Sequence, residues 1–229
     1  DGKLVGIPYP FYDTGESKYI IYFGTDNNSL YAVRDNTTSG EQKWKQTAVP
    51  PVTTTVICDG TDLYYGSSDK YVYARRCSDG SEAWQSSGAT GDTIYSSPSL
   101  NSADLYIGSN DKRIYQINVT DGVIKTSYLT GAAVKASPWV AFDMGVLYVG
   151  SDSLYSLNSS NAGYRWAYRH ADGGATQSSP WLDWHNTNYI FWGDDNGKLF
   201  YVRDDADSAK SNPENWSTYP CSAGIAIAS

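Results

Sequence analysis

Five glycines that each follow an aromatic-rich stretch recur at a nearly constant interval along this chain of 229 residues. They are Gly24, Gly66, Gly108, Gly150 and Gly193, and their successive separations are 42, 42, 42 and 43 residues. A period of this length is typical of proteins in which one supersecondary unit is stacked on copies of itself. We therefore expect an array of five similar units.

Several other positions keep the same phase. An aromatic residue follows each glycine after five to seven positions, at Tyr31, Tyr73, Tyr115, Tyr155 and Phe200. A turn glycine then precedes a tryptophan in most copies, at Trp44, Trp84 and Trp166, and Trp216 is expected to fill this position in the fifth copy. The third copy has Thr126 there instead. A Ser-Pro step precedes the next copy at Ser97-Pro98, Ser137-Pro138 and Ser179-Pro180.

These positions predict four short strands per copy. The first begins at the Ser-Pro step, where a proline costs no ladder hydrogen bond, and the second ends at the repeated glycine. A polar turn leads to the third strand, which carries the aromatic residue, and the fourth begins near the tryptophan. One such antiparallel sheet cannot bury both of its faces, whereas copies stacked about an axis can. The predicted fold is an all-β propeller of four-stranded antiparallel blades, since a β-helix has shorter coils and a β-sandwich does not repeat five times.

We expect a single domain over residues 1–229. The predicted repeats span approximately residues 7–50, 51–94, 95–134, 135–177 and 178–220, and residues 221–229 form the start of a further repeat or a closing strand. Two alternatives follow from this phase: a closed five-bladed ring, or part of a propeller of six to eight blades. The expectation favours the second, because the sequence breaks off inside a motif.

The motif YYGSSDKYVYARRCSDGSEAW followed by TIYSSPSL resembles the repeat of pyrroloquinoline-quinone-type (PQQ-like) propellers, and the resemblance covers essentially the whole chain. Repeats of this kind occur in quinoprotein alcohol dehydrogenases, in the lipoprotein scaffold of the outer-membrane β-barrel assembly machine, and in surface or sensor proteins without a quinone. The resemblance thus implies a fold and leaves the chemistry open.

The residues favour the non-enzymatic branch of that family. Family quinoproteins carry a vicinal Cys-Cys disulfide beside the cofactor, and Cys58, Cys77 and Cys221 are not adjacent to one another. No calcium-binding and catalytic Glu/Asn/Asp set can be placed, and GxSxG, HExxH and phosphate-loop motifs are absent from the sequence. We therefore predict no catalysis and no cofactor.

The net charge, the two histidines and the acidic clusters limit the kinds of ligand and partner that we expect. The formal net charge of −8 argues against nucleic acid and against anionic lipid, and no apolar run approaches the roughly eighteen residues of a membrane span. His170 and His185 have no Cys or His nearby, so a zinc site is not expected. Calcium has two acidic candidates, Asp194-Asp195-Asn196-Gly197 and Asp204-Asp205-Ala206-Asp207, for which solvated turns are the favoured interpretation.

Two kinds of modification site are candidates. Cys58 and Cys77 could form a disulfide, and unpaired buried thiols are the favoured alternative. N-glycosylation sequons occur at Asn27, Asn36, Asn118, Asn158 and Asn215. Three of these, Asn36, Asn118 and Asn158, fall in the turn between the third and fourth strands, so they would share one rim, and partners would use the opposite rim.

The first functional hypothesis is an extracellular, cell-surface or periplasmic propeller that acts as a protein-binding scaffold or assembles with itself. A propeller that binds carbohydrate or another small ligand is the alternative, and an exposed pair among Trp181, Trp184 and Trp192 could stack on a sugar. A fragment of a quinoprotein dehydrogenase is the second alternative.

Overall fold

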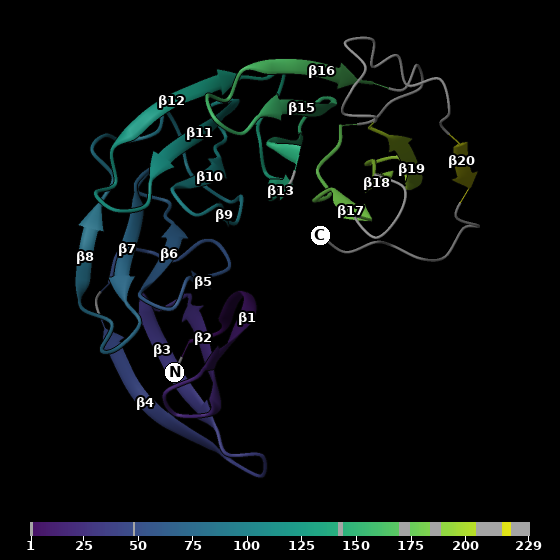
Figure 1. The fold of residues 1–229 in the computed structure, drawn as a ribbon. Helices are drawn as coiled ribbons and strands as arrows, with labels where there is room; N and C mark the ends of the chain where they lie inside the picture. Colours follow the sequence, from purple (N-terminus) through teal and green to yellow (C-terminus); the bar gives the residue numbers. More distant parts are fainter. Residues whose placement is uncertain are drawn as a thin grey trace.

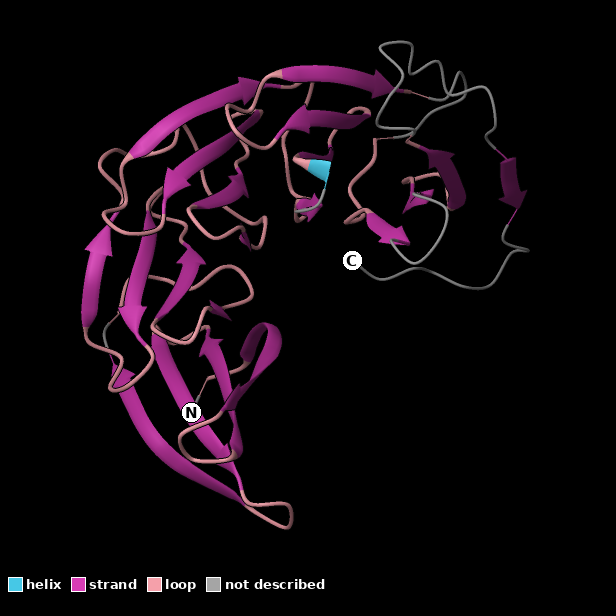
Figure 2. Ribbon diagram, viewed as in Figure 1, coloured by secondary structure: helices cyan, strands magenta, loops and turns pink. Residues whose placement is uncertain are grey.

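A computed structural model of the chain describes residues 2–47, 49–141, 144–169, 175–183, 189–204 and 217–220. These residues form five four-stranded antiparallel sheets that follow one another along an arc (Figure 1). Strands dominate throughout, with one short helical turn next to β14 (Figure 2). The expected β-propeller blades are thereby confirmed. No helix among the described residues is long and apolar enough to cross a membrane.

Within each sheet the strands are paired in chain order. The first sheet holds β1 (Leu4–Asp13), β2 (Lys18–Thr25), β3 (Ser29–Asp35) and β4 (Gly40–Thr47), and the second holds β5 (Ile57–Cys58), β6 (Asp62–Gly66), β7 (Val72–Arg76) and β8 (Glu82–Gln85). The third holds β9 (Ser99–Leu100), β10 (Asp104–Gly108), β11 (Arg113–Asn118) and β12 (Ile124–Leu129). The fourth holds β13 (Trp139–Ala141), β14 (Val146–Gly150), β15 (Leu154–Asn158) and β16 (Tyr164–Tyr168), and the fifth holds β17 (Trp181–Asp183), β18 (Tyr189–Gly193), β19 (Lys198–Arg203) and β20 (Ser217–Pro220).

The first strand of every blade lies on the concave side of the arc, and the outer strands β4, β8, β12 and β16 lie on the convex side (Figure 1). Because neighbouring strands are antiparallel, the turns after the first and third strands share one rim. The turns after the second strands share the other rim with the connections between blades. Trp216, Asn215, Cys221 and residues 221–229 lie outside the described part of the chain.

Burial of the second strands shows which blades have neighbours on both faces. All five residues of β6, of β10 and of β14 are buried, although successive side chains of a strand point to opposite faces. By contrast, β2 and β18 contain partly exposed residues among buried ones. The inner three blades are therefore covered on both faces, and the first and fifth blades stand apart at the two ends of the arc (Figure 1).

Four apolar clusters of the described residues fill the four spaces between consecutive blades. The space between the first two blades contains Ile20, Tyr22 and Trp44 together with Leu63 and Tyr65. The next three spaces are filled in the same way by side chains of the second and third, third and fourth, and fourth and fifth blades. The hydrophobic core is thus divided into layers, each shared by two sheets.

The repeated glycines stand where the connection to the next blade lies against the end of the second strand. A Cβ atom on Gly108 would lie 2.3 Å from Cγ1 of Val134 and 2.8 Å from its backbone oxygen, in the connection to the next blade. Gly66 meets Ile94 in the same way, at 2.3 Å, and Gly24 meets Val52 at 2.5 Å. Close approach of the connection to the next blade therefore explains why this position is glycine in the first four copies.

We predict that Gly108→Ala destabilises the protein by about 1–3 kcal/mol, because the added methyl group overpacks the contact with Val134. Gly88→Ala is the matched control, since its Cβ would meet only Ile124 Cδ1, at an ordinary 3.8 Å. Urea unfolding of both variants measures the difference. Equal unfolding free energies would contradict the role assigned to Gly108.

Candidate functional site

The described repeat tryptophans lie between blades, and two of them bind the next blade by a hydrogen bond. The Trp44 indole Nε1–H donates to the backbone oxygen of Cys77 (2.9 Å), and Trp84 donates likewise to Val119 (2.8 Å). Each indole also covers the turn glycine of that next blade, since a Cβ on Gly122 would lie 2.6 Å from Cε3 of Trp84. Trp166 packs beside Tyr148 in the space between the fourth and fifth blades, and its Nε1 has no partner among the described residues.

The third blade, which has Thr126 in place of tryptophan, satisfies the corresponding carbonyl differently. The Tyr106 hydroxyl donates to the backbone oxygen of Ser159, and the Gln116 amide donates to the same oxygen at 3.3 Å. Tyr106 stands two residues before Gly108, and its counterpart Tyr22 donates to Cys77 at 3.4 Å. A tyrosine stands two residues before the repeated glycine in four of the five copies, and this recurrence is the only sign in the sequence that the position has a structural role.

The difference between Trp84 and Trp166 gives a direct test of this hydrogen bond. Trp84→Phe removes the donor to the Val119 carbonyl, so we expect a loss of about 1–3 kcal/mol in the free energy of unfolding. Trp166→Phe removes a similar ring portion without a described hydrogen bond and should cost less. Comparable losses in chemical denaturation would argue that ring packing alone matters.

The rim that carries the second-strand turns is held by aspartates. Asp111 accepts hydrogen bonds from the Tyr115 hydroxyl of its own blade and from the backbone N–H of Gly91, which lies in the preceding connection. Asp152 repeats this arrangement with Tyr155 (2.8 Å) and Gly131 (2.9 Å). Burial, together with the aspartate hydrogen bond, raises the pKa of Tyr115 and of Tyr155 to about 12, so both hydroxyls stay protonated donors at neutral pH.

A ladder of backbone-to-hydroxyl hydrogen bonds runs from blade to blade where each inner strand begins. The Ile7 N–H donates to Thr55 Oγ1 (3.1 Å) and the Thr55 N–H to Ser97 Oγ (3.0 Å). The Ser97 N–H donates to Ser137 Oγ (3.1 Å) and the Ser137 N–H to Ser179 Oγ (2.9 Å). The serine of the Ser-Pro step therefore joins consecutive blades, a role that the sequence analysis did not assign.

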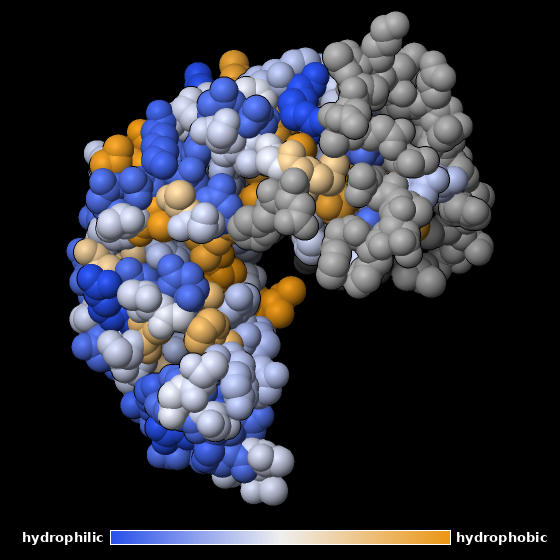
Figure 3. All heavy atoms as spheres, in the orientation of Figure 1, coloured by the Kyte–Doolittle hydropathy of each residue, from blue (hydrophilic) through white to orange (hydrophobic). Residues whose placement is uncertain are grey.

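The inner edge, which we define by Leu4, Ile7, Tyr95, Lys135 and Trp181, exposes side chains beside this ladder. Relative exposure reaches 74% for Ile7, 56% for Leu4, 52% for Trp181 and 50% for Tyr95, and Lys135 is also exposed. Apolar residues are visible along the concave side in Figure 3. Unlike the buried repeat positions, these residues differ from copy to copy, and the inner edge is therefore the candidate functional surface.

The predicted sequons occupy both rims. Asn118 and Asn158 end the third strands of their blades and Asn36 directly follows one, so all three lie on one rim, and Asn27 lies in the β2–β3 turn on the other. The Asn158 side-chain oxygen accepts from the backbone N–H of Ser160 (2.9 Å), and that of Asn118 accepts from Thr120 (2.8 Å). Asn27 and Asn158 are exposed, and Asn36 and Asn118 are partly exposed. Their glycosylation stays a prediction.

The acidic calcium candidates are placed in two different ways. Asp194 Oδ1 accepts from the backbone N–H groups of Asn196 (3.0 Å) and Lys198 (2.9 Å), as in a polar turn. The buried Asp204 binds Arg165 (2.7 Å) and the Tyr148 hydroxyl (2.5 Å) of the preceding blade. The rest of that cluster, with Trp184 and both histidines, lies outside the described residues. Within the described ranges, no group of three or more His, Cys, Asp or Glu could hold a metal ion.

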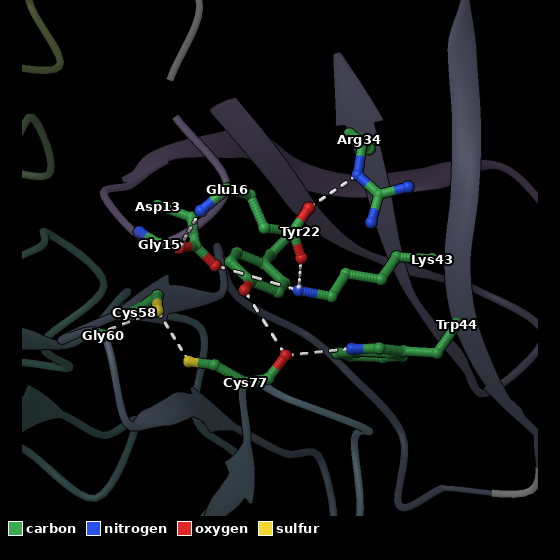
Figure 4. A network of polar contacts seen from close by, with 10 residues as sticks. All are labelled: Asp13, Gly15, Glu16, Tyr22, Arg34, Lys43, Trp44, Cys58, Gly60 and Cys77. Atoms are coloured by element: carbon green, nitrogen blue, oxygen red, sulfur yellow. Dashed lines mark hydrogen bonds and ion pairs between the residues drawn. The ribbon is translucent and has the colours of Figure 1, made fainter. Parts of the chain in front are cut away.

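An ion-pair cluster joins the β1–β2 turn of the first blade to the strands β3 and β4. Glu16 binds Arg34 Nε and Lys43 Nζ, each at 2.6 Å, and Lys43 also lies 3.8 Å from Asp13 (Figure 4). The hydrogen bonds from Arg34 and then Lys43 lower the pKa of Glu16 to about 2. Asp13 Oδ1 accepts from the backbone N–H groups of Gly15 and Glu16 and thereby shapes the β1–β2 turn.

We predict that Glu16→Gln lowers the thermal midpoint at pH 7. Because the folded-state pKa lies below the unfolded one, the stabilising effect is present above about pH 5 and is lost as the pH falls towards 2. Thermal unfolding of both proteins from pH 7 to pH 3 should therefore show a difference that shrinks with acid, and that 0.5 M NaCl also reduces. A difference independent of pH would refute the role of the ionised carboxylate.

Comparisons with known proteins agree with this geometry. The model of a family described as outer membrane protein assembly factor BamB matches residues 10–86, and no curated protein matches the sequence. BamB from Moraxella catarrhalis has a similar solved structure, with 15% identity, a TM-score of 0.68, and coverage of 88% of this chain and 61% of that one.

Two further solved structures share the fold. Quinohemoprotein alcohol dehydrogenase from Comamonas testosteroni has 14% identity and a TM-score of 0.68, with coverage of 88% of this chain and 41% of that one. The computationally designed Ika8 protein has 11% identity and a TM-score of 0.66, with coverage of 87% and 58%. The chain thus spans less than two thirds of each of these structures.

Proposed function

We propose that this chain belongs to the PQQ-like β-propeller repeat family, as the matches of its sequence and fold support, and that it is a non-catalytic protein-binding scaffold of the cell envelope or the cell exterior. The observation that carries the proposal is the inner edge, where Leu4, Ile7, Tyr95 and Trp181 are each at least half exposed. Large apolar and aromatic side chains are the groups that anchor protein–protein contacts.

The different environments of repeated and unrepeated residues support the protein-binding role. Described repeat positions such as Trp84, Tyr115 and Ser97 are engaged in contacts between blades, Tyr115 by packing in the apolar cluster shared by the second and third blades. Side chains on the inner edge lie on a rigid ladder and are free to meet a partner that carries apolar groups. A preorganised surface of this kind binds without ordering itself, which favours affinity.

The family resemblance adds a second line of support. A protein with the same fold is named as an assembly factor, and an assembly factor acts through contacts with other proteins. An envelope location follows from the same analogy, and the fractionation of source cells would test it.

We predict that Ile7→Ser combined with Tyr95→Ser weakens binding of the natural partner at least tenfold, because both anchors leave the contact. Leu129→Ser is the control: Leu129 is 56% exposed but lies on the convex strand β12. Photocrosslinking in source cells, with the reactive group at position 95 or at position 129, identifies the partner, and titration with the purified partner gives the affinities.

Each outcome of that experiment has a distinct meaning. A protein crosslinked at position 95 and not at 129 supports the proposal, and the chain itself as that partner would indicate self-assembly. Binding only to glycans would support the carbohydrate alternative instead. Equal crosslinking from both positions, or none from position 95, would sink the assignment of the inner edge.

The structural likeness to a quinohemoprotein alcohol dehydrogenase favours one competing function, a quinone-dependent oxidoreductase. Dye-linked alcohol oxidation after addition of pyrroloquinoline quinone and calcium distinguishes the two. Our proposal expects no activity above the level of quinone and calcium without the protein. Turnover that requires the protein would replace the scaffold assignment.

A further inference from the structure

Two cysteines face each other in the layer between the first and second blades. Cys58 ends β5, and Cys77 directly follows β7. Their sulfur atoms lie 2.6 Å apart, and the two residues are only 3% and 6% exposed (Figure 4).

Contacts that do not involve the cysteine sulfurs fix this approach. Cys58 is paired with Leu63 in the β5–β6 ladder, and the Cys77 N–H donates to the backbone oxygen of Thr61 (2.9 Å). The Cys77 carbonyl also accepts hydrogen bonds from Trp44 and Tyr22 of the first blade. The fold itself therefore brings the two thiols together.

The third blade shows what these positions hold when no sulfur is present. Repeat alignment places Leu100 where the second blade has Cys58, and Val119 where it has Cys77. Leu100 and Val119 pack against the same apolar cluster. An ordinary pair of aliphatic side chains thus suffices for packing, and the cysteine pair adds chemistry that the layer does not need.

We propose that Cys58 and Cys77 form an intramolecular disulfide that joins the inner strand β5 to the end of β7. The two thiols lose their protons and two electrons, a bond forms between the sulfurs, and the electrons reduce the disulfide of a thiol oxidant to two thiols. Such an oxidant is available in extracellular and periplasmic compartments. This inference rests on the envelope or extracellular location in the proposed function and not on the protein-binding role.

The surroundings of the pair indicate when the reaction takes place. The hydrogen bond with Cys58, burial, and the negative charge of Asp59 raise the pKa of Cys77 far above that of an ordinary thiol. A buried neutral thiol is a poor nucleophile, because the thiolate is the reactive form. Since both residues are buried in the closed layer, we expect oxidation to take place before that layer closes and the finished bond to be shielded from reductants.

Refolding tests the proposal without knowledge of any partner. Cys221→Ser leaves only the pair; this variant is unfolded with reductant, refolded with oxidised and reduced glutathione, quenched with acid, and alkylated in denaturant. We expect no alkylation before reduction and two alkylated cysteines after it, with a crosslinked peptide that contains Cys58 and Cys77. Free thiols or glutathione adducts as the main product would overturn the proposal.

Stability provides a second readout. The oxidised Cys221→Ser protein should melt about 5–10 °C above its reduced form, because the bond closes a loop between positions 19 residues apart. The matched control is Cys58→Leu with Cys77→Val in the same background, which places the third-blade residues in the second blade. Its melting temperature should not respond to reductant. Equal melting temperatures for the oxidised and reduced parent would count against a staple between these strands.

Discussion

Face-to-face packing of consecutive sheets underlies the other features of this protein. At the repeated glycines the approach is so close that it leaves no room for a Cβ atom. Gly108 and its counterparts let the connection to the next blade lie against the end of the second strand. The approach places the indole of Trp84 within reach of the carbonyl of Val119, and Asp152 within reach of the Gly131 N–H. A sheet with both faces covered in this way can be buried along its whole second strand, as β10 is.

The same packing separates structural residues from those that are free to act. Polar groups that recur in several copies bind neighbouring parts of the protein: the Tyr115 hydroxyl donates to Asp111, and the Ser97 hydroxyl accepts from the Thr55 N–H. What remains on the concave side is a set of side chains that share a backbone geometry but not a chemistry, such as Ile7, Tyr95 and Lys135. A repeated fold whose exposed side chains differ from copy to copy is well suited to recognising a particular partner.

The period of the glycines was enough to predict the blades, their strand order and the place of each turn, because these depend on local spacing. The partners of individual side chains could not be predicted, since they lie in a different copy. Nothing local signals that Gln116 donates to the Ser159 carbonyl, or that Asp204 pairs with Arg165 of the preceding blade. The inner edge was missed for a related reason: Tyr95 interrupts the repeat, and sequence analysis of a repeat gives weight to what recurs.

The ladder along the inner strands has a direction, because each blade gives an N–H to the blade that follows and takes one from the blade before it. A unit with this head-to-tail self-complementarity can be multiplied by tandem duplication without the invention of a new contact. Each duplicate can then change at its own interface, as in the third copy, where Gln116 and the recurring Tyr106 bind the carbonyl that an indole binds in other copies. The number of blades can therefore change by duplication, as long as each copy keeps the contact with its neighbours.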